Sequence, residues 1–121
     1  MGRVRSEELK GRTKTFGVAV MKLVEELPRT TLTEVFGRQL LRCATSVGAN
    51  YRAACRGRSH ADFVAKIGVV EEEADESAYW LEFLLETGHG DKTEVSSLLK
   101  EANELTAIFT ASGRTARRNS S

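Results

Sequence analysis

The chain has 121 residues and a mass of 13.3 kDa, which suffices for one domain with a hydrophobic core, and 40% of its residues are hydrophobic. This composition excludes an intrinsically disordered chain, and no apolar run reaches the roughly 18 residues of a membrane span. Lysine and arginine together number 18 against 17 aspartates and glutamates, a net charge of +1 that by itself gives no indication of a nucleic-acid partner. We expect a soluble, cytoplasmic protein without a membrane partner.

The sequence offers no pattern typical of catalysis or metal binding. Cys43 and Cys55 lie on one expected helix, about 18 Å apart at 1.5 Å per residue, which is beyond disulfide reach. His60 and His89 are the only histidines, and neither forms a cluster with zinc-ligand spacing. No nucleophile or general base accompanies the paired carboxylates, and no glycine-rich loop follows a strand. We therefore predict a protein that is not an enzyme, with no catalytic residue, metal or cofactor.

Pro28 and the glycines at 57, 88 and 90 divide the chain into four helical stretches. The first is expected from about residue 6 to 27, after a flexible basic N-terminus at residues 1–5. The second is expected from about residue 32 to 55, because apolar side chains repeat there every three or four positions. Gly37 and Gly48 lower helix propensity within it, which suggests close packing or a local bend.

The third stretch begins with Ser59 and Asp62, a capping pair, and ends at Gly88. The fourth begins with Asp91 and Glu94 in the same arrangement and ends before Gly113, leaving a disordered basic tail at residues 113–121. Four amphipathic helices with short connections favour an all-α fold, an antiparallel up-down-up-down four-helix bundle over residues 6–112.

The charges are separated along the chain. No acid occurs between residues 35 and 61, whereas residues 62–86 contain eight acids and one base. On a helical wheel the arginines of the second helix lie within about 40° of Arg38 on either side and opposite its apolar residues. The basic residues of this segment are Arg38, Arg42, Arg52, Arg56 and Arg58.

This arginine stripe has two interpretations. Because guanidinium groups match phosphates and no acid interrupts the stripe, it is a candidate surface for binding RNA or DNA. Alternatively, it is the solvated face of an amphipathic helix, or its members pair with the acidic stripe of the third helix in the same subunit or a neighbouring one. Such surface pairs contribute little unless they form networks.

Aromatic side chains lie on two sides of the third helix. Tyr79, Trp80 and Phe83 face away from its core stripe, and large aromatic side chains are favoured anchors of interfaces. We predict an oligomer interface there that also includes Glu72 and Glu76. The alternative is that the N-terminal segment or the tail covers these aromatics within one subunit.

A dense motif runs from residue 39 to 84. Its parts are Gln39, Arg42-Cys43-Ala44, Ser46-Val47, Ala49-Asn50, Arg58-Ser59, Asp62-Phe63 and Glu73-Ala74 with Glu76. This pattern resembles the four-helix-bundle family first noticed as reading frames in intervening sequences of bacterial 23S ribosomal RNA genes. The family includes the accessory variability determinant (Avd) proteins of diversity-generating retroelements. Cys43 departs from the commoner serine, and Tyr51-Arg52-Ala53-Ala54 replaces a run that contains an acid in many members.

The resemblance implies a four-helix bundle that assembles as a homo-oligomer, a ring of five. In the retroelement branch such rings associate with a reverse transcriptase and with nucleic acid. Our leading hypothesis is therefore a non-enzymatic, oligomeric accessory protein that binds nucleic acid through its arginine stripe, with RNA, DNA and a reverse transcriptase as candidate partners. The second hypothesis is a protein-interaction scaffold whose arginines pair with acidic helices of neighbouring subunits and which binds no nucleic acid.

Overall fold

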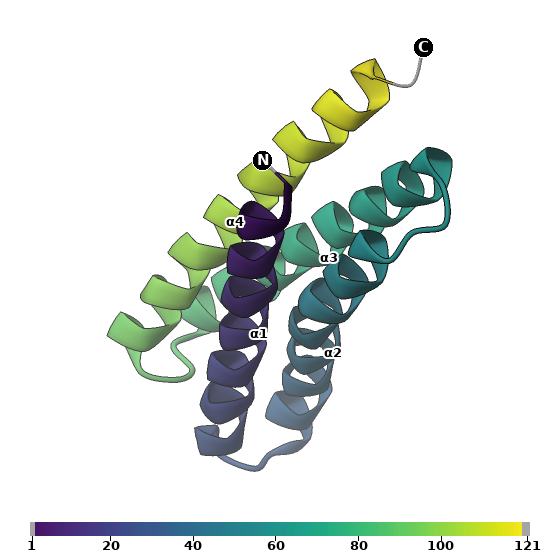
Figure 1. Cartoon of the computed structure of the whole chain (residues 1–121). Helices are drawn as coiled ribbons and strands as arrows, with labels where there is room; N and C mark the ends of the chain where they lie inside the picture. Colours follow the sequence, from purple (N-terminus) through teal and green to yellow (C-terminus); the bar gives the residue numbers. More distant parts are fainter. Residues whose placement is uncertain (1, 120–121) are drawn as a thin grey trace.

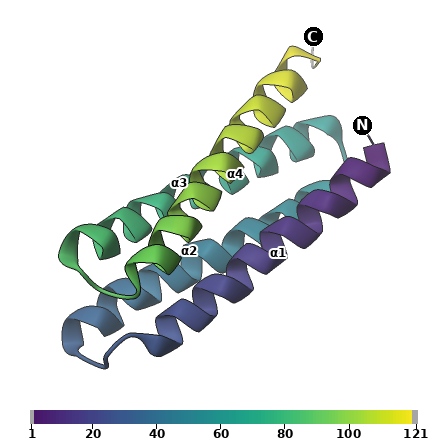
Figure 2. The ribbon, with the colours of Figure 1, turned by 90° about the vertical axis from the view of Figure 1, so that its left-hand side faces the viewer.

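The structure is a computed structural model that describes residues 2–119. It consists of four α-helices: α1 (Gly2–Glu26), α2 (Thr31–Cys55), α3 (His60–Thr87) and α4 (Lys92–Arg118). Consecutive helices pack against one another, and α4 returns to contact α1 (Figure 1). The beginning of α1 and the end of α4 lie at the same end of the bundle (Figure 2). The predicted all-α, up-down four-helix bundle is thus confirmed.

Local signals in the sequence account for most helix boundaries. The hydroxyl of Ser59 accepts the backbone N–H of Asp62 at 3.1 Å, and the carboxylate of Asp91 accepts that of Glu94 at 3.0 Å, so both predicted caps are confirmed. Gly88 ends α3 in the left-handed region, with φ of 72°, where a side chain would be strained. The first residue of α2 is Thr31, one position earlier than expected.

Both ends of the chain are more helical than the sequence predicted. Helix α1 begins at Gly2 rather than near Ser6, and Met1 lies outside the described residues. Helix α4 continues through Gly113 to Arg118, so the tail that was expected to be disordered is helical at residues 113–118. Residue 119 follows the helix, and residues 120–121 lie outside the described part. The physical reason is packing, because Gly113 and Ala116 are buried.

The core consists of the apolar stripes of all four helices. Its fully buried side chains include Phe16 of α1, Leu40 of α2, Leu81 of α3 and Phe109 of α4. Arg12 lies at the edge of this core and ties α1 to α4 through ion pairs with two α4 carboxylates.

Candidate nucleic-acid interface

Arg38, Arg42 and Arg52 lie on the exposed side of α2, opposite the core, and Arg56, the C-cap residue of the helix, is exposed as well. The buried apolar side chains of α2 recur every three or four positions and pack one face of the helix against the core. This packing fixes the opposite face, which carries the arginines, toward solvent. Arg58 follows in the connection to α3 and is also exposed. The arginine stripe therefore exists as a surface feature. Its five members nevertheless have different surroundings.

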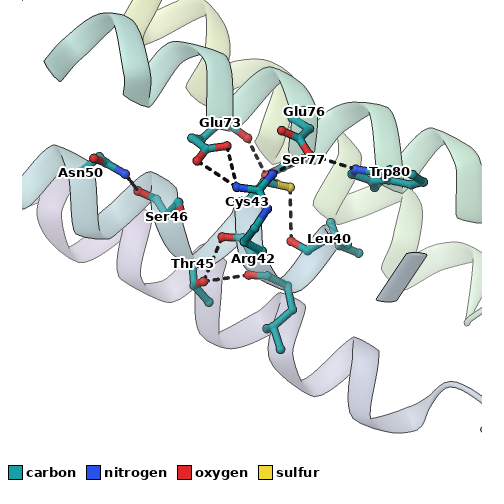
Figure 3. A network of polar contacts seen from close by, with 11 residues as sticks. Leu40, Arg42, Cys43, Thr45, Ser46, Asn50, Glu73, Glu76, Ser77 and Trp80 are labelled. Carbon is teal, nitrogen blue, oxygen red and sulfur yellow. Dashed lines mark hydrogen bonds and ion pairs between the residues drawn. The ribbon is translucent and has the colours of Figure 1, made fainter. Parts of the chain in front are cut away.

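Arg42 is bound to the acidic helix within the same chain. Its guanidinium lies 3.2 Å from a carboxylate oxygen of Glu73 and 2.7 Å from one of Glu76, as Figure 3 shows. The hydrogen bond to Glu76 and the two negative charges raise the pKa of Arg42 above its ordinary value. The indole N–H of Trp80 donates to the same Glu76 carboxylate at 3.3 Å. Of the alternatives that the sequence allowed for Arg42, the structure thus shows pairing with acids of α3 in the same subunit.

Cys43, another residue of the motif, lies beside this ion pair where α2 packs against α3. The Sγ atom of buried Cys43 lies 3.4 Å from the hydroxyl oxygen of Ser77, and that hydroxyl donates to the carbonyl of Glu73 at 2.8 Å. Burial raises the pKa of the Cys43 thiol, which remains a neutral packing group. Asn50 donates to the carbonyl of Ser46 at 2.9 Å within α2. Much of the motif therefore serves helix packing.

Arg52 and Arg56 lie in a groove between α1 and α2 of about 590 Å³. Lys10 and Lys14 line the same groove from α1. Within residues 4–119 neither Arg52 nor Arg56 has a carboxylate within ion-pair distance. The charge pattern of α2 does not indicate these two lysines, although their spacing of four positions places them on one side of α1.

The remaining two arginines are separated from this groove. Arg38 lines a different hollow at the other end of the α1–α2 pair, where Glu25 and Glu34 are also present. The backbone N–H of Arg58 donates to the carboxylate of Asp62 at 3.3 Å, and that carboxylate also pairs with Lys66 at 2.6 Å. The ammonium group of Lys66 is the main cause of the lowered pKa of Asp62. The five arginines thus lie in four different surroundings.

The predicted interface residues form an exposed patch on α3. Tyr79 is 56% exposed and Phe83 is 36% exposed, and both rings contact the half-buried Trp80. On α2, Leu32 and Val35 expose 68% and 57% of their surface. We call Tyr79, Trp80 and Phe83 the aromatic patch.

The two acids assigned to the interface differ from each other. Glu72 is exposed, whereas Glu76 is already bound by Arg42 and Trp80. The beginning of α1 and the end of α4 lie at the far end of the bundle from the end of α3 (Figure 2). Within the described residues, therefore, neither chain end covers the aromatic patch.

The described residues were also searched for clusters of metal-ligating side chains and for membrane-spanning helices. Among residues 2–119 no three side chains of His, Cys, Asp or Glu come together as metal ligands would. No helix in that part of the chain combines the length and the apolar character needed to cross a bilayer. Both cysteines are free thiols.

The fold and this surface define a small four-helix bundle with a basic face and an aromatic patch. The chain belongs to the 23S rRNA-intervening sequence protein family, whose model matches residues 7–111. It is similar to a solved protein of unknown function from the S23 ribosomal protein family of Bacteroides thetaiotaomicron. The two share 28% identity with a TM-score of 0.79 over 90% of this chain and 97% of that one. No curated protein matches the chain. The resemblance to intervening-sequence proteins is confirmed.

Proposed function

We propose that this protein is an oligomeric accessory protein that binds nucleic acid along the exposed side of α2 and has no enzymatic activity of its own. The observation that carries the proposal is the state of Arg52 and Arg56, which are exposed and have no carboxylate partner in the part of the chain that is described. Guanidinium groups in this state are available to phosphates. In this role the bundle would hold nucleic acid for a partner such as a reverse transcriptase, as the resemblance implies for the retroelement branch.

The test is a pair of charge reversals that leaves Arg42 unchanged. Reversing Arg42 would place a third carboxylate beside Glu73 and Glu76, so weaker binding could result from damage to the α2–α3 contact. We expect Arg52→Glu with Arg56→Glu to lower affinity for a short RNA or DNA duplex by about tenfold or more. The salt dependence should also become shallower, by about one unit of slope for each phosphate that the variant no longer binds.

The matched control is Lys92→Glu with Lys100→Glu, two exposed positions on α4 that change the net charge by the same amount. This control should bind nearly as tightly as the unchanged protein. Anisotropy of a labelled duplex measures affinity, and circular dichroism checks that each variant is folded. An Arg52 and Arg56 variant that is folded and binds as tightly as the control would contradict the proposal.

The scaffold hypothesis retains one supporting observation. Several acids of α3 are exposed and available to another subunit: Glu72, Asp75, Glu82 and Glu86. If arginines of a neighbouring subunit pair with these acids, the Arg52 and Arg56 variant should dissociate. Light scattering on the same sample distinguishes the two functions, because nucleic-acid binding requires that the mass remain unchanged while affinity falls.

A further inference from the structure

The groove between α1 and α2 has cations on both of its sides. Lys10 and Lys14 come from α1, Arg52 comes from α2, and Arg56 is the C-cap residue of α2. Lys10 bonds to Glu7 at 3.0 Å, an exposed pair that competes weakly with a ligand. The other three cations make no ion pair within residues 4–119. A strand of phosphates entering the groove would therefore meet positive charge from two helices.

The rest of the groove is lined by Glu7, the partner of Lys10, and by small side chains. Gly11, Gly48 and Ala49 line it together with Thr45. A Cβ atom added at Gly11 would have no atom within 4 Å, so the space above this glycine is open. A ligand can therefore approach the backbone of α1 closely enough for the long cationic side chains to reach it from either side.

The groove contains no aromatic residue among its lining side chains in the described part of the chain. Proteins that hold single-stranded nucleic acid generally stack bases on aromatic rings. The groove therefore offers no ring on which a base could stack. A duplex keeps its bases stacked internally and presents a dense array of phosphates, about one charge per 1.7 Å of helix axis. The chemistry of the groove thus favours backbone contacts to a duplex.

We propose that the groove between α1 and α2 is the binding site for the sugar-phosphate backbone of a nucleic-acid duplex, with Lys10 and Lys14 contributing alongside Arg52 and Arg56. This inference rests on the proposed function and specifies both its site and its ligand. Recognition through phosphates alone is independent of base sequence. The site would therefore accept duplexes of unrelated sequence with similar affinity.

Gly11→Leu tests the groove without changing any charge. The leucine side chain would occupy the open space above α1, and it improves helix propensity, so the variant should remain folded. We expect its affinity for a short RNA duplex to fall about tenfold. Gly68→Leu is the matched control, because Gly68 is also inside a helix, on α3, and its added Cβ likewise meets no atom within 4 Å. The control should bind as the unchanged protein does.

Lys14→Glu tests the contribution of α1, with Lys22→Glu as its control on the same helix. Both lysines are exposed, but only Lys14 lines the groove. We expect Lys14→Glu to lower duplex affinity severalfold and Lys22→Glu to leave it nearly unchanged. The unpaired strand of the same sequence should bind more weakly than the duplex to the unchanged protein.

The results separate this inference from the function on which it rests. If the Arg52 and Arg56 variant binds weakly while Gly11→Leu and Lys14→Glu bind normally, the arginines act on an open helix face and the groove is not the site. If the unpaired strand binds as tightly as the duplex, the assignment of a duplex ligand is overturned. If the Arg52 and Arg56 variant itself binds normally, the proposed function fails.

Discussion

Arg42 has a structural partner, whereas Arg52 and Arg56 have no carboxylate partner among the described residues. The guanidinium of Arg42 bridges two carboxylates of α3, Glu73 and Glu76, and the second of these also accepts the indole N–H of Trp80. A planar fork that contacts two carboxylates fixes the rotation of one helix against the next more firmly than an isolated surface pair does. Arg42 therefore contributes to how α2 and α3 pack.

We predict that Arg42→Ala lowers the midpoint of thermal unfolding by about 2–5 °C, because the ion pairs are removed and two carboxylates are left close together. Arg42→Lys should restore part of the loss, since an ammonium group keeps the charge but cannot reach both carboxylates as a fork. Circular dichroism measures both effects. Duplex affinity should stay within about twofold of the unchanged protein. A normal midpoint combined with a large drop in affinity would instead show that Arg42 contacts the ligand.

The sequence predicts the direction of each arginine on α2 but not what faces it. A helical wheel contains only the geometry of its own helix, and the acids that bind Arg42 come 31 and 34 positions later in the chain. Their proximity depends on the rotation of α3, which is set by side-chain packing across the bundle. Caps at Ser59 and Asp91 were predictable because each requires only a neighbour three residues away.

Helices α1 and α2 approach closely where small residues meet. A Cβ atom added at Gly48 would lie 3.3 Å from the hydroxyl of Thr13 and 3.4 Å from its backbone carbonyl carbon. One added at Gly37 would lie 3.4 Å from Val24. These approaches explain two glycines within a helix, as the sequence suggested. They also set the separation of the two helices that line the basic groove.

We predict that Gly48→Leu destabilises the protein by about 1–3 kcal/mol, because a backbone atom of Thr13 cannot move aside without displacing α1. Gly48→Ala should be close to neutral, since its gain of about 1 kcal/mol in helix propensity offsets a tight contact. Urea unfolding measures both, and Gly68→Leu is the control for placing a leucine at an open helix position. Equal stability of the two leucine variants would contradict a close α1–α2 approach.

The end of α4 shows why a local stop signal can fail. Ser112 and Gly113 were expected to end the helix, yet Gly113 is buried, and a Cβ there would lie 3.5 Å from Ile67 of α3. The ring N–H of His60 donates to the carbonyl of Ala116 at 2.8 Å, one turn further on. Contacts with another helix thus extend α4 past a glycine that would otherwise favour termination.

At the scale of the whole molecule, near-neutral charge coexists with separated surfaces. Part of the acidic helix neutralises Arg42 within the subunit, whereas the groove on the other side of α2 retains its basic side chains. The aromatic patch lies toward the end of the bundle where α3 finishes, and it exposes the rings of Tyr79 and Phe83. Exposed aromatic rings of this kind are typical of a surface that another protein covers.

A second copy of this chain is the occupant that we expect on the aromatic patch, in an assembly of five subunits as the family resemblance implies. We predict that Tyr79→Ser with Phe83→Ser lowers the mass measured by light scattering to that of a smaller species. The control is Val18→Ser with Met21→Ser, which removes two apolar side chains of α1 that are 43% and 42% exposed. This control should keep the mass of the unchanged protein.

Assembly should also strengthen binding, because several basic grooves on one particle can engage the same duplex and raise its affinity by about tenfold or more. The Tyr79 and Phe83 variant should therefore bind a long duplex more weakly than the unchanged protein, although its groove residues are intact. On a duplex too short to span two grooves, the variant and the unchanged protein should bind alike. A variant with unchanged mass would place the oligomer contact elsewhere on the bundle. Reduced mass with equal affinity for the long duplex would show that each subunit binds independently.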